Sequence, residues 1–153
     1  MDSQMLCYFA YGSNMNPRRM ESRGVEVYSM KSAYLNGYEL VFNKLSSSTL
    51  GEGFANIRTN PESMVEGILY EINPAGISNL DHYEKYPFEY DRSLFEVVHS
   101  GSENIMAYAY IAQPGRIATS LKPRRNYLNH LLCAEGYLST KYIARLNNVV
   151  TLD

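Results

Sequence analysis

The segment from Leu6 to Pro17, Leu-Cys-Tyr-Phe-Ala-Tyr-Gly-Ser-Asn-Met-Asn-Pro, most constrains how this chain can fold. Residues 6–11 carry no charge and are rich in aromatic side chains, which predicts a strand covered on both faces. Gly12 then permits backbone angles that a residue with a Cβ resists. Asn14 or Asn16 can cap a helix that Pro17 opens, because the first helical turn does not need the N–H that proline lacks.

A junction of this kind presents several free backbone N–H groups to one small volume. Such a volume suits a carboxylate or a developing oxyanion. We therefore expect the rest of the chain to build a pocket around the strand–turn–helix junction.

The composition predicts one globular domain over residues 1–153. Apolar residues make up 45% of the chain, so disorder is not expected. A net charge of −2 gives no general attraction to nucleic acid or to an anionic membrane. We find no pattern of a signal peptide or a membrane span. Cys7 and Cys133 lie in apolar contexts, which favours buried free thiols and a cytoplasmic location.

Hydrophobic alternation predicts most of the sheet in the first two thirds of the chain. Tight turns are expected at Asn36-Gly37, at Asn60-Pro61 and at residues 101–104. Besides the opening strand, the expected strands are residues 25–34, 38–42, 54–58, 64–72, 90–100 and 105–112.

Helical signals are sparse at first and dominate the end of the chain. Short helices are expected at residues 17–23 and 74–84, the second ending before Pro87. Two more follow, one opened by Pro123 and one capped by Ser139. This order predicts an α+β fold in which helices flank a small, mixed, barrel-like sheet.

Glu84 is the most informative polar residue. In a helix over residues 74–84, Ile77, Leu80 and Glu84 share one face, so a carboxylate stands where an apolar residue would continue the buried stripe. Tyr83 and Phe88 add apolar bulk nearby. Desolvation would raise the carboxyl pKa toward the range of a general base. The alternative is a frayed last turn with Glu84 in solvent.

Other chemistries have weaker signals. Ser13 could be a nucleophile with His82, His99 or His130 as its base, but the second glycine of a nucleophile elbow is missing, and His82 and His130 fall at helix positions expected to face solvent. The histidines and cysteines match no metal-ligand spacing, so no metal is expected. A basic cluster near the last helices either faces solvent or pairs with a substrate carboxylate; it comprises Arg116, Lys122, Arg124 and Arg125.

Several segments together resemble the gamma-glutamylcyclotransferase family. The opening Tyr-Phe-Ala-Tyr-Gly-Ser-Asn and the Leu-Asp-His-Tyr-Glu that ends at Glu84 are specific as a pair. The resemblance runs in order along nearly the whole chain. Its other pieces are residues 53–57, 65–70 and 107–110, with Tyr90, Tyr127 and Tyr142-Ile143.

The resemblance implies a compact α+β fold around a small β-barrel and an intramolecular aminolysis. The α-amino group of a γ-glutamyl unit attacks its own γ-carbonyl, releasing 5-oxoproline and an amine or amino acid. No cofactor is implied, because nucleophile and electrophile are tethered. Glu84 matches the catalytic glutamate. The implied substrate-binding residues are Tyr8, Phe9, Ala10, Tyr11, Gly12, Ser13 and Asn14 in the substrate loop, with Tyr90 and Tyr127 at the pocket wall.

Lys85 departs from the family pattern, which commonly has glycine after the glutamate. A cation there could lower the pKa of Glu84 if it folded inward, and we expect it to face solvent instead. A second reading of the chain is a non-catalytic binder of a small amino-acid-like ligand on the same fold. The leaving group is left open, and the loop at residues 46–53 and the Arg124-Arg125 region are where we expect it to be selected.

Overall fold

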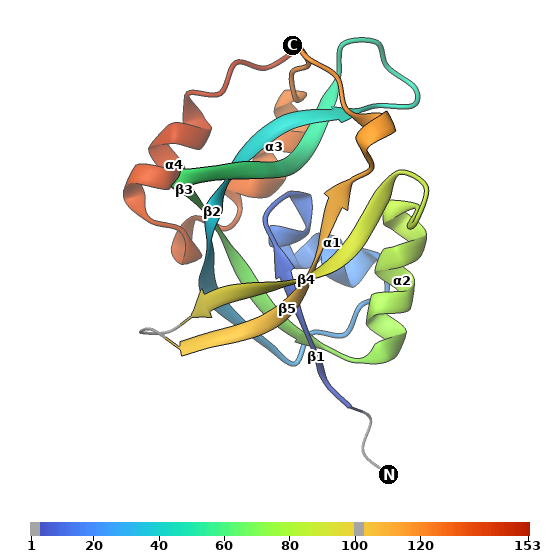
Figure 1. The fold of residues 1–153 in the computed structure, drawn as a ribbon, viewed down its shortest axis with the longest axis vertical. Coiled ribbons are helices and arrows are strands. Elements are labelled where there is room, and N and C mark those ends of the chain that lie inside the picture. The colour runs from blue at the N-terminus through green and yellow to red at the C-terminus, as the bar shows by residue number, and fades with distance from the viewer. Residues whose placement is uncertain (1–3, 100–102) are drawn as a thin grey trace.

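The computed structural model describes residues 4–99 and 103–153, and the predicted turn at residues 101–104 lies largely outside them. Within this part of the chain, five strands close into a barrel in the order β1-β3-β2-β4-β5 (Figure 1). β1 runs parallel to β5, with Tyr8 opposite Tyr108, and all other neighbours are antiparallel. The expected mixed barrel is therefore confirmed. The strands are β1 (Leu6–Ala10), β2 (Ser29–Leu45), β3 (Gly53–Ile72), β4 (Tyr90–His99) and β5 (Glu103–Ala112).

Helices flank the barrel, and side-chain caps fix where most of them begin. Asn16 caps α1, Asn73 caps α2 and Ser139 caps α4, each accepting a backbone N–H of the first turn. Among the described residues, no helix is both long and apolar enough to cross a bilayer. The helices are α1 (Pro17–Ser22), α2 (Pro74–Glu84), α3 (Arg125–Leu132) and α4 (Thr140–Asn147), with short 3-10 turns η1 (Ser13–Met15), η2 (Pro114–Arg116) and η3 (Glu135–Tyr137).

The two tight turns predicted within the first half of the sheet are wrong. β2 and β3 are each continuous, and they pair along almost their whole length. The register shifts between Asn36 and Tyr38, so Gly37, with φ of 85°, is part of a bulge instead of a hairpin turn. Pro61 lies between Thr59 and Met64, where the β2–β3 ladder is interrupted, a position that tolerates its missing N–H. Pairing over two long strands thus outweighs the local turn signals.

Both faces of the sheet are buried along most of β1 and along the last part of β3, which explains the apolar character of these segments. Phe9, Val65 and Leu69 pack inside the barrel, whereas Tyr8 and Tyr70 face outward under the helices. Side chains therefore alternate between two cores along these segments. The helices contribute Met20 from α1, Leu80 from α2, Leu128 and Leu131 from α3, and Tyr142 and Leu146 from α4.

Only part of the prediction for the cysteines holds. Both thiols are free, as expected, and Cys7 is half-buried. Cys133 is exposed, because it follows the last residue of α3 and lies outside the apolar stripe that Leu128 and Leu131 bury.

Close packing between strands makes a prediction at Gly67. A Cβ there would lie 2.3 Å from the Ala10 carbonyl oxygen and 2.9 Å from the Phe9 ring, so a methyl group must displace β1. Gly67→Ala should lower the free energy of unfolding by about 3 kcal/mol, measured by urea denaturation. Gly115→Ala is the matched control, since nothing lies within 4 Å of its Cβ position. Equal stabilities of the two variants would contradict this view of the packing.

Candidate active site

The strand–turn–helix junction has the expected form, with one difference in the role of its glycine. β1 ends at Ala10, η1 follows Gly12 and α1 starts at Pro17. Gly12 has φ of −116°, so positive φ is not why it lacks a Cβ. A Cβ at Gly12 would come within 3.0 Å of the Ala55 Cβ, and this close approach is what favours glycine. The first bond of η1 runs from Met15 N–H to the Gly12 carbonyl, which leaves the N–H groups of Ser13 and Asn14 without partners in the turn.

A cavity of about 250 Å³ opens beside this junction. Most of the residues expected to bind substrate line it, together with Glu84. Phe9 and Ala10 do not, because both are buried within the two cores. The lining also contains four cations, Arg19, Arg23, Lys44 and Lys85. Its predicted members are Tyr8, Tyr11, Gly12, Ser13, Asn14, Glu84, Tyr90 and Tyr127.

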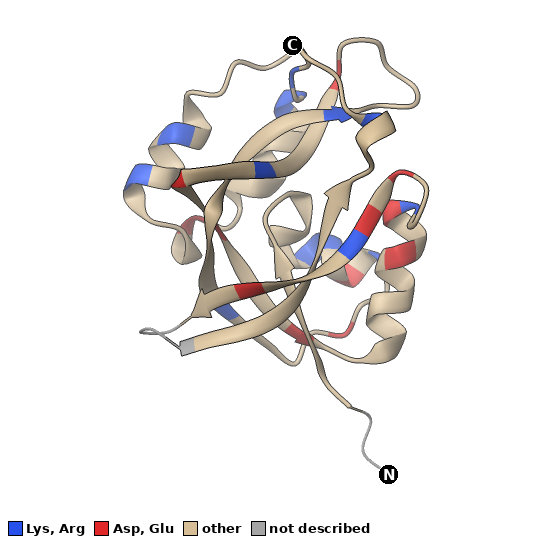
Figure 2. Cartoon of the chain, in the orientation of Figure 1, with Lys and Arg blue, Asp and Glu red and all other residues tan. Residues whose placement is uncertain are grey.

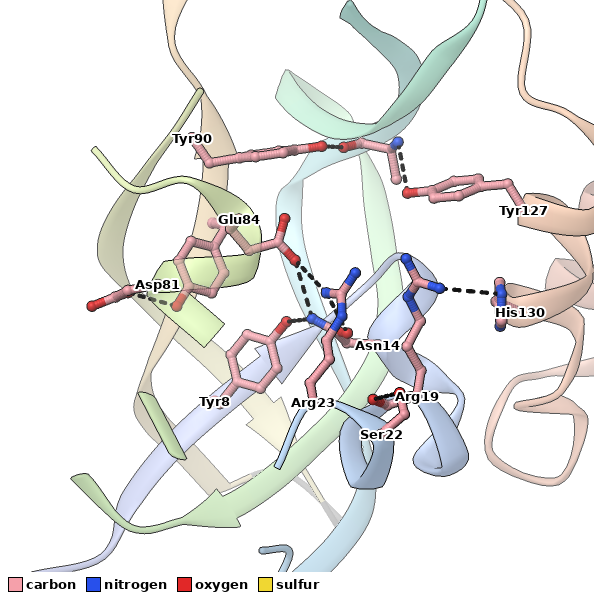
Figure 3. Close-up of polar contacts among 12 residues, drawn as sticks. Tyr8, Asn14, Arg19, Ser22, Arg23, Asp81, Glu84, Tyr90, Tyr127 and His130 are labelled. Carbon is pink, nitrogen blue, oxygen red and sulfur yellow. Dashed lines mark hydrogen bonds and ion pairs between the residues drawn. The ribbon is translucent and has the colours of Figure 1, made fainter. Parts of the chain in front are cut away.

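Glu84 faces the cavity and is not in a frayed turn. It is the last residue of α2, and Leu80 on the same face is fully buried. The Glu84 side chain is only 18% exposed. Its Oε2 accepts hydrogen bonds from Asn14 Nδ2 and from Arg23 Nη1, each at 3.2 Å (Figure 3). The helical spacing therefore located this carboxylate correctly.

The environment of Glu84 raises its carboxyl pKa above the ordinary value, and burial is the largest cause. The pKa of Glu84 is lowered by the charges of Arg23 and Arg19 and by the hydrogen bond from Asn14. These effects are smaller than that of burial, so the net shift of the pKa is upward. Phe88 is 79% exposed, so the expectation that neighbours along the chain would desolvate Glu84 is wrong for this residue. Among the described residues none donates to Glu84 Oε1, which leaves that oxygen available to a ligand.

Asn14 holds the carboxylate in place. Its Nδ2 also donates to the Tyr8 hydroxyl at 2.9 Å, and its Oδ1 accepts from Arg23 Nη1 at 3.1 Å. The Tyr70 hydroxyl donates to the Asn14 carbonyl at 2.7 Å. Asn16, not Asn14, caps α1, so the choice left open by the sequence is settled. Asn14 is a residue of the site and links the junction to Glu84.

Three tyrosine rings form part of the cavity wall, and two of their hydroxyls donate to backbone carbonyls. The Tyr90 hydroxyl donates to the Ala55 carbonyl at 2.8 Å, and the Tyr127 hydroxyl accepts from the Ala55 N–H at 3.1 Å. Tyr11 donates to the Tyr110 carbonyl. Burial raises the pKa of Tyr127 to about 12, so it is neutral at pH 7. Tyr11 and Tyr90 therefore offer the cavity flat apolar surfaces, whereas Tyr127 keeps an O–H donor that no acceptor among the described residues takes.

The serine–histidine alternative finds no support in the geometry. Ser13 is buried at the edge of the cavity, yet no histidine of the described residues lines it. His82 is exposed. His130 is half-buried and contacts Asn16 and Arg19, so its expected exposure is wrong.

The basic cluster near the last helices does not line the cavity either. Arg116 pairs with Glu89 at 3.0 Å, and Arg124 pairs with Glu52 at 3.6 Å. Lys85 is exposed at the rim, as expected, and adopts φ of 55°, a left-handed conformation that glycine adopts more easily. The groups that shift the pKa of Glu84 do not include Lys85.

Sequence reasoning missed two arginines of the site, Arg19 in α1 and Arg23 at the C-cap of that helix. Arg23 forms an ion pair with Glu84, and its side chain is 12% exposed. Figure 2 shows the basic residues of the α1 segment beside acidic residues of α2. Arg19 and Arg23 are four residues apart, a spacing that places them on one helix face. That spacing could have shown that the two arginines share a face. It could not have shown which residues this face contacts, because Glu84 is distant in the sequence.

Comparisons with known proteins agree with this geometry. A family model described as gamma-glutamyl cyclotransferase, AIG2-like, matches residues 8–130. The gamma-glutamylcyclotransferases of Bos taurus and Homo sapiens are 31% and 30% identical over 86 residues. Each match covers 54% of this chain and 46% of the relative, so it spans about half the length of those proteins.

Solved structures extend the likeness of the fold to almost the whole chain. A structure titled gamma-glutamyl cyclotransferase superposes with a TM-score of 0.85 at 22% identity, over 98% of this chain and 90% of that one. The structure of an uncharacterized protein from Homo sapiens superposes with a TM-score of 0.85 at 24% identity, over 97% of this chain and 90% of that one. The chain belongs to the gamma-glutamyl cyclotransferase, AIG2-like family, which confirms the resemblance found in the sequence.

The balance of charges around Glu84 makes a prediction that needs no assay of activity. The Glu84 carboxyl should titrate above the ordinary value of about 4.3 in a ¹³C NMR titration, with Glu84→Gln assigning its resonance. Arg23→Gln should move the midpoint further up, because Arg23 stabilises the carboxylate. Arg58→Gln removes the more exposed Arg58–Glu39 pair and should leave Glu84 unchanged. A midpoint that falls in Arg23→Gln would refute this account.

Proposed function

We propose that this chain is a gamma-glutamyl cyclotransferase. Its substrate is a γ-glutamyl amide, and its products are 5-oxoproline and an amine or amino acid. The observation that carries the proposal is the position of Glu84, a partly desolvated carboxylate that lines the same cavity as the residues of the opening junction. Membership of the family supports the same reaction.

In this mechanism Glu84 is the general base. Its unpartnered Oε1 takes a proton from the α-ammonium, and the neutral amine attacks the γ-carbonyl carbon. The new C–N bond closes a five-membered ring, and a tetrahedral oxyanion forms. Glu84 then gives the proton to the leaving nitrogen as its bond to carbon breaks and the oxyanion becomes the lactam carbonyl. The carboxylate so regenerated takes the extra proton from the ring nitrogen, which leaves the amide nitrogen of 5-oxoproline neutral. The raised pKa of Glu84 serves these transfers, because it brings the carboxyl closer to neutrality.

The cavity walls supply orientation. The rings of Tyr90 and Tyr127 restrict the bound chain to a folded form, which places the amine near its target carbon. Backbone N–H groups at Ser13 and Asn14 are available for the oxyanion or for the substrate carboxylate. Phe9 and Ala10 contribute through packing, since they lie behind the cavity wall.

The leaving group is selected where Ser46–Ser48 lines the cavity, together with Lys44, which pairs with Glu89 at 2.5 Å. This supports the loop at residues 46–53 as a specificity element, whereas Arg124 and Arg125 stand outside the lining. The free thiols of Cys7 and Cys133 accord with a cytoplasmic location, which stays a prediction from the sequence.

Removing the base tests the mechanism directly. Glu84→Gln keeps acceptors for Asn14 and Arg23 but cannot take a proton. Release of 5-oxoproline from a panel of γ-glutamyl amino acids and γ-glutamylamines should fall by at least about 100-fold, the lower range for a general base. The melting temperature should change by only a few degrees. Full turnover in this variant rules the mechanism out.

The second candidate is a non-catalytic binder of a γ-glutamyl compound on the same fold. It predicts calorimetric binding of the panel compounds with no 5-oxoproline formed over hours. Ser13→Ala separates both candidates from a serine hydrolase, because a cyclotransferase needs the Ser13 backbone and not its hydroxyl. We expect that variant to keep most of its turnover, and complete loss would favour the hydrolase.

A further inference from the structure

Arg19 has an unusual environment for a partly buried cation. It lies on α1 and lines the cavity. Its Nε is buried and has no hydrogen-bond partner within residues 4–99 and 103–153. In the described part of the chain no carboxylate lies within ion-pair distance of its guanidinium. The one polar contact of that group joins Nη1 to Nε2 of His130, at 3.4 Å.

That contact is not a hydrogen bond once the neighbouring groups are taken into account. Asn16 Oδ1 accepts the Arg18 N–H as the cap of α1, so the Asn16 group facing His130 is the Nδ2 donor. At 3.0 Å from this donor, His130 Nδ1 must be the acceptor. A neutral imidazole then carries its proton on Nε2, which turns a donor toward Arg19. The Arg19 guanidinium therefore lacks an acceptor among the described residues.

Arg23 provides the contrast on the same face of the helix. Its Nη1 donates to both Glu84 and Asn14, and its guanidinium lies 5.0 Å from the Tyr83 ring centroid. Arg23 is thus satisfied within the protein, whereas Arg19 is not. A desolvated guanidinium without acceptors is costly, and an anion in the cavity would remove that cost. The planar fork of donors matches a carboxylate in particular.

The place of Arg19 relative to Glu84 suggests which carboxylate. The charge on Arg19 acts on the Glu84 carboxyl, so the two side chains are electrostatic neighbours. Figure 3 shows the guanidinium groups of Arg19 and Arg23 on the same side of α1 as the Glu84 carboxyl. An amino acid carries its ammonium and its carboxylate on one carbon. A site for that end of a substrate needs a base and a cation close together, as here.

We propose that Arg19 binds the α-carboxylate of the γ-glutamyl substrate and so is a specificity-determining residue. The inference rests on the proposed function and deepens it. With the α-carboxylate held by Arg19 and the α-ammonium by Glu84, the backbone N–H groups of Ser13 and Asn14 are left for the oxyanion. The position of the substrate around its α-carbon is then defined at two points.

The test compares two substrates that differ only in this carboxylate. A γ-glutamyl anilide cyclises to 5-oxoproline, and the matching 4-aminobutyryl anilide cyclises to 2-pyrrolidinone. In the unaltered protein kcat/KM should favour the first by about 100-fold or more, as expected for a charge-assisted contact. Arg19→Gln should bring the ratio close to one, chiefly through KM, and Arg19→Lys should restore part of it.

Arg18→Gln is the matched control, because Arg18 is the exposed neighbour on α1 and does not line the cavity. It should keep the full ratio. Arg19→Gln should also leave the melting temperature equal or higher, since it removes a desolvated cation, whereas loss of a structural arginine would lower it. A ratio that survives in Arg19→Gln overturns the assignment while the proposed function stands.

If no γ-glutamyl compound is turned over, the proposed function fails and binding decides the role of Arg19. Calorimetry then compares 5-oxoproline with 2-pyrrolidinone, which again differ only in the carboxylate. Preference for 5-oxoproline that is lost in Arg19→Gln and kept in Arg18→Gln supports a carboxylate site. Equal affinities of the unaltered protein and Arg19→Gln for 5-oxoproline overturn it.

Discussion

The site depends on one interaction, the contact of the Glu84 carboxylate with Arg23 and Asn14 at the edge of the cavity. It joins the end of α2 to the segment that follows β1, so it fixes the base relative to the backbone N–H groups of the junction. Burial favours the neutral carboxyl and Arg23 favours the carboxylate, and burial has the larger effect. The opposed effects keep Glu84 ordered while its pKa stays above the ordinary range.

The barrel makes this contact possible by burying both faces of β1 and of the last part of β3. β1 and β3 pack one set of side chains inside the barrel and the other set under the helices. Because β1 is held on both faces, the turn that follows it has little freedom. Gly12 then lets that turn approach Ala55, whose backbone is held by Tyr90 and Tyr127. The rigid wall and the junction enclose the same cavity.

The cations that line the cavity differ in whether a carboxylate of the protein pairs with them. Arg23 and Lys44 are paired with Glu84 and Glu89, whereas Arg19 has no acceptor in the part of the chain that the structure describes. Paired cations shape the protein itself, and an unpaired, partly buried cation instead suits a ligand of opposite charge. A zwitterionic glutamyl end, with its ammonium and carboxylate on one carbon, complements the arrangement of Glu84 and Arg19.

Local patterns in the sequence determined the approximate positions of the helices, the cap of α4 at Ser139 and the inward face of Glu84, because helical periodicity and capping act over a few residues. They left open whether Asn14 or Asn16 caps α1, and α3 begins at Arg125, two residues after Pro123, which the sequence predicts as its start. Tertiary structure alone decided the rest. β2 and β3 run through their turn signals because each pairs along the other's length. Arg23 reaches Glu84 across 61 positions of sequence. The packing of α3 on α1 decides which nitrogen of His130 faces Arg19, and hence that His130 offers Arg19 no acceptor. Such contacts are set by packing between distant segments, which no local pattern encodes.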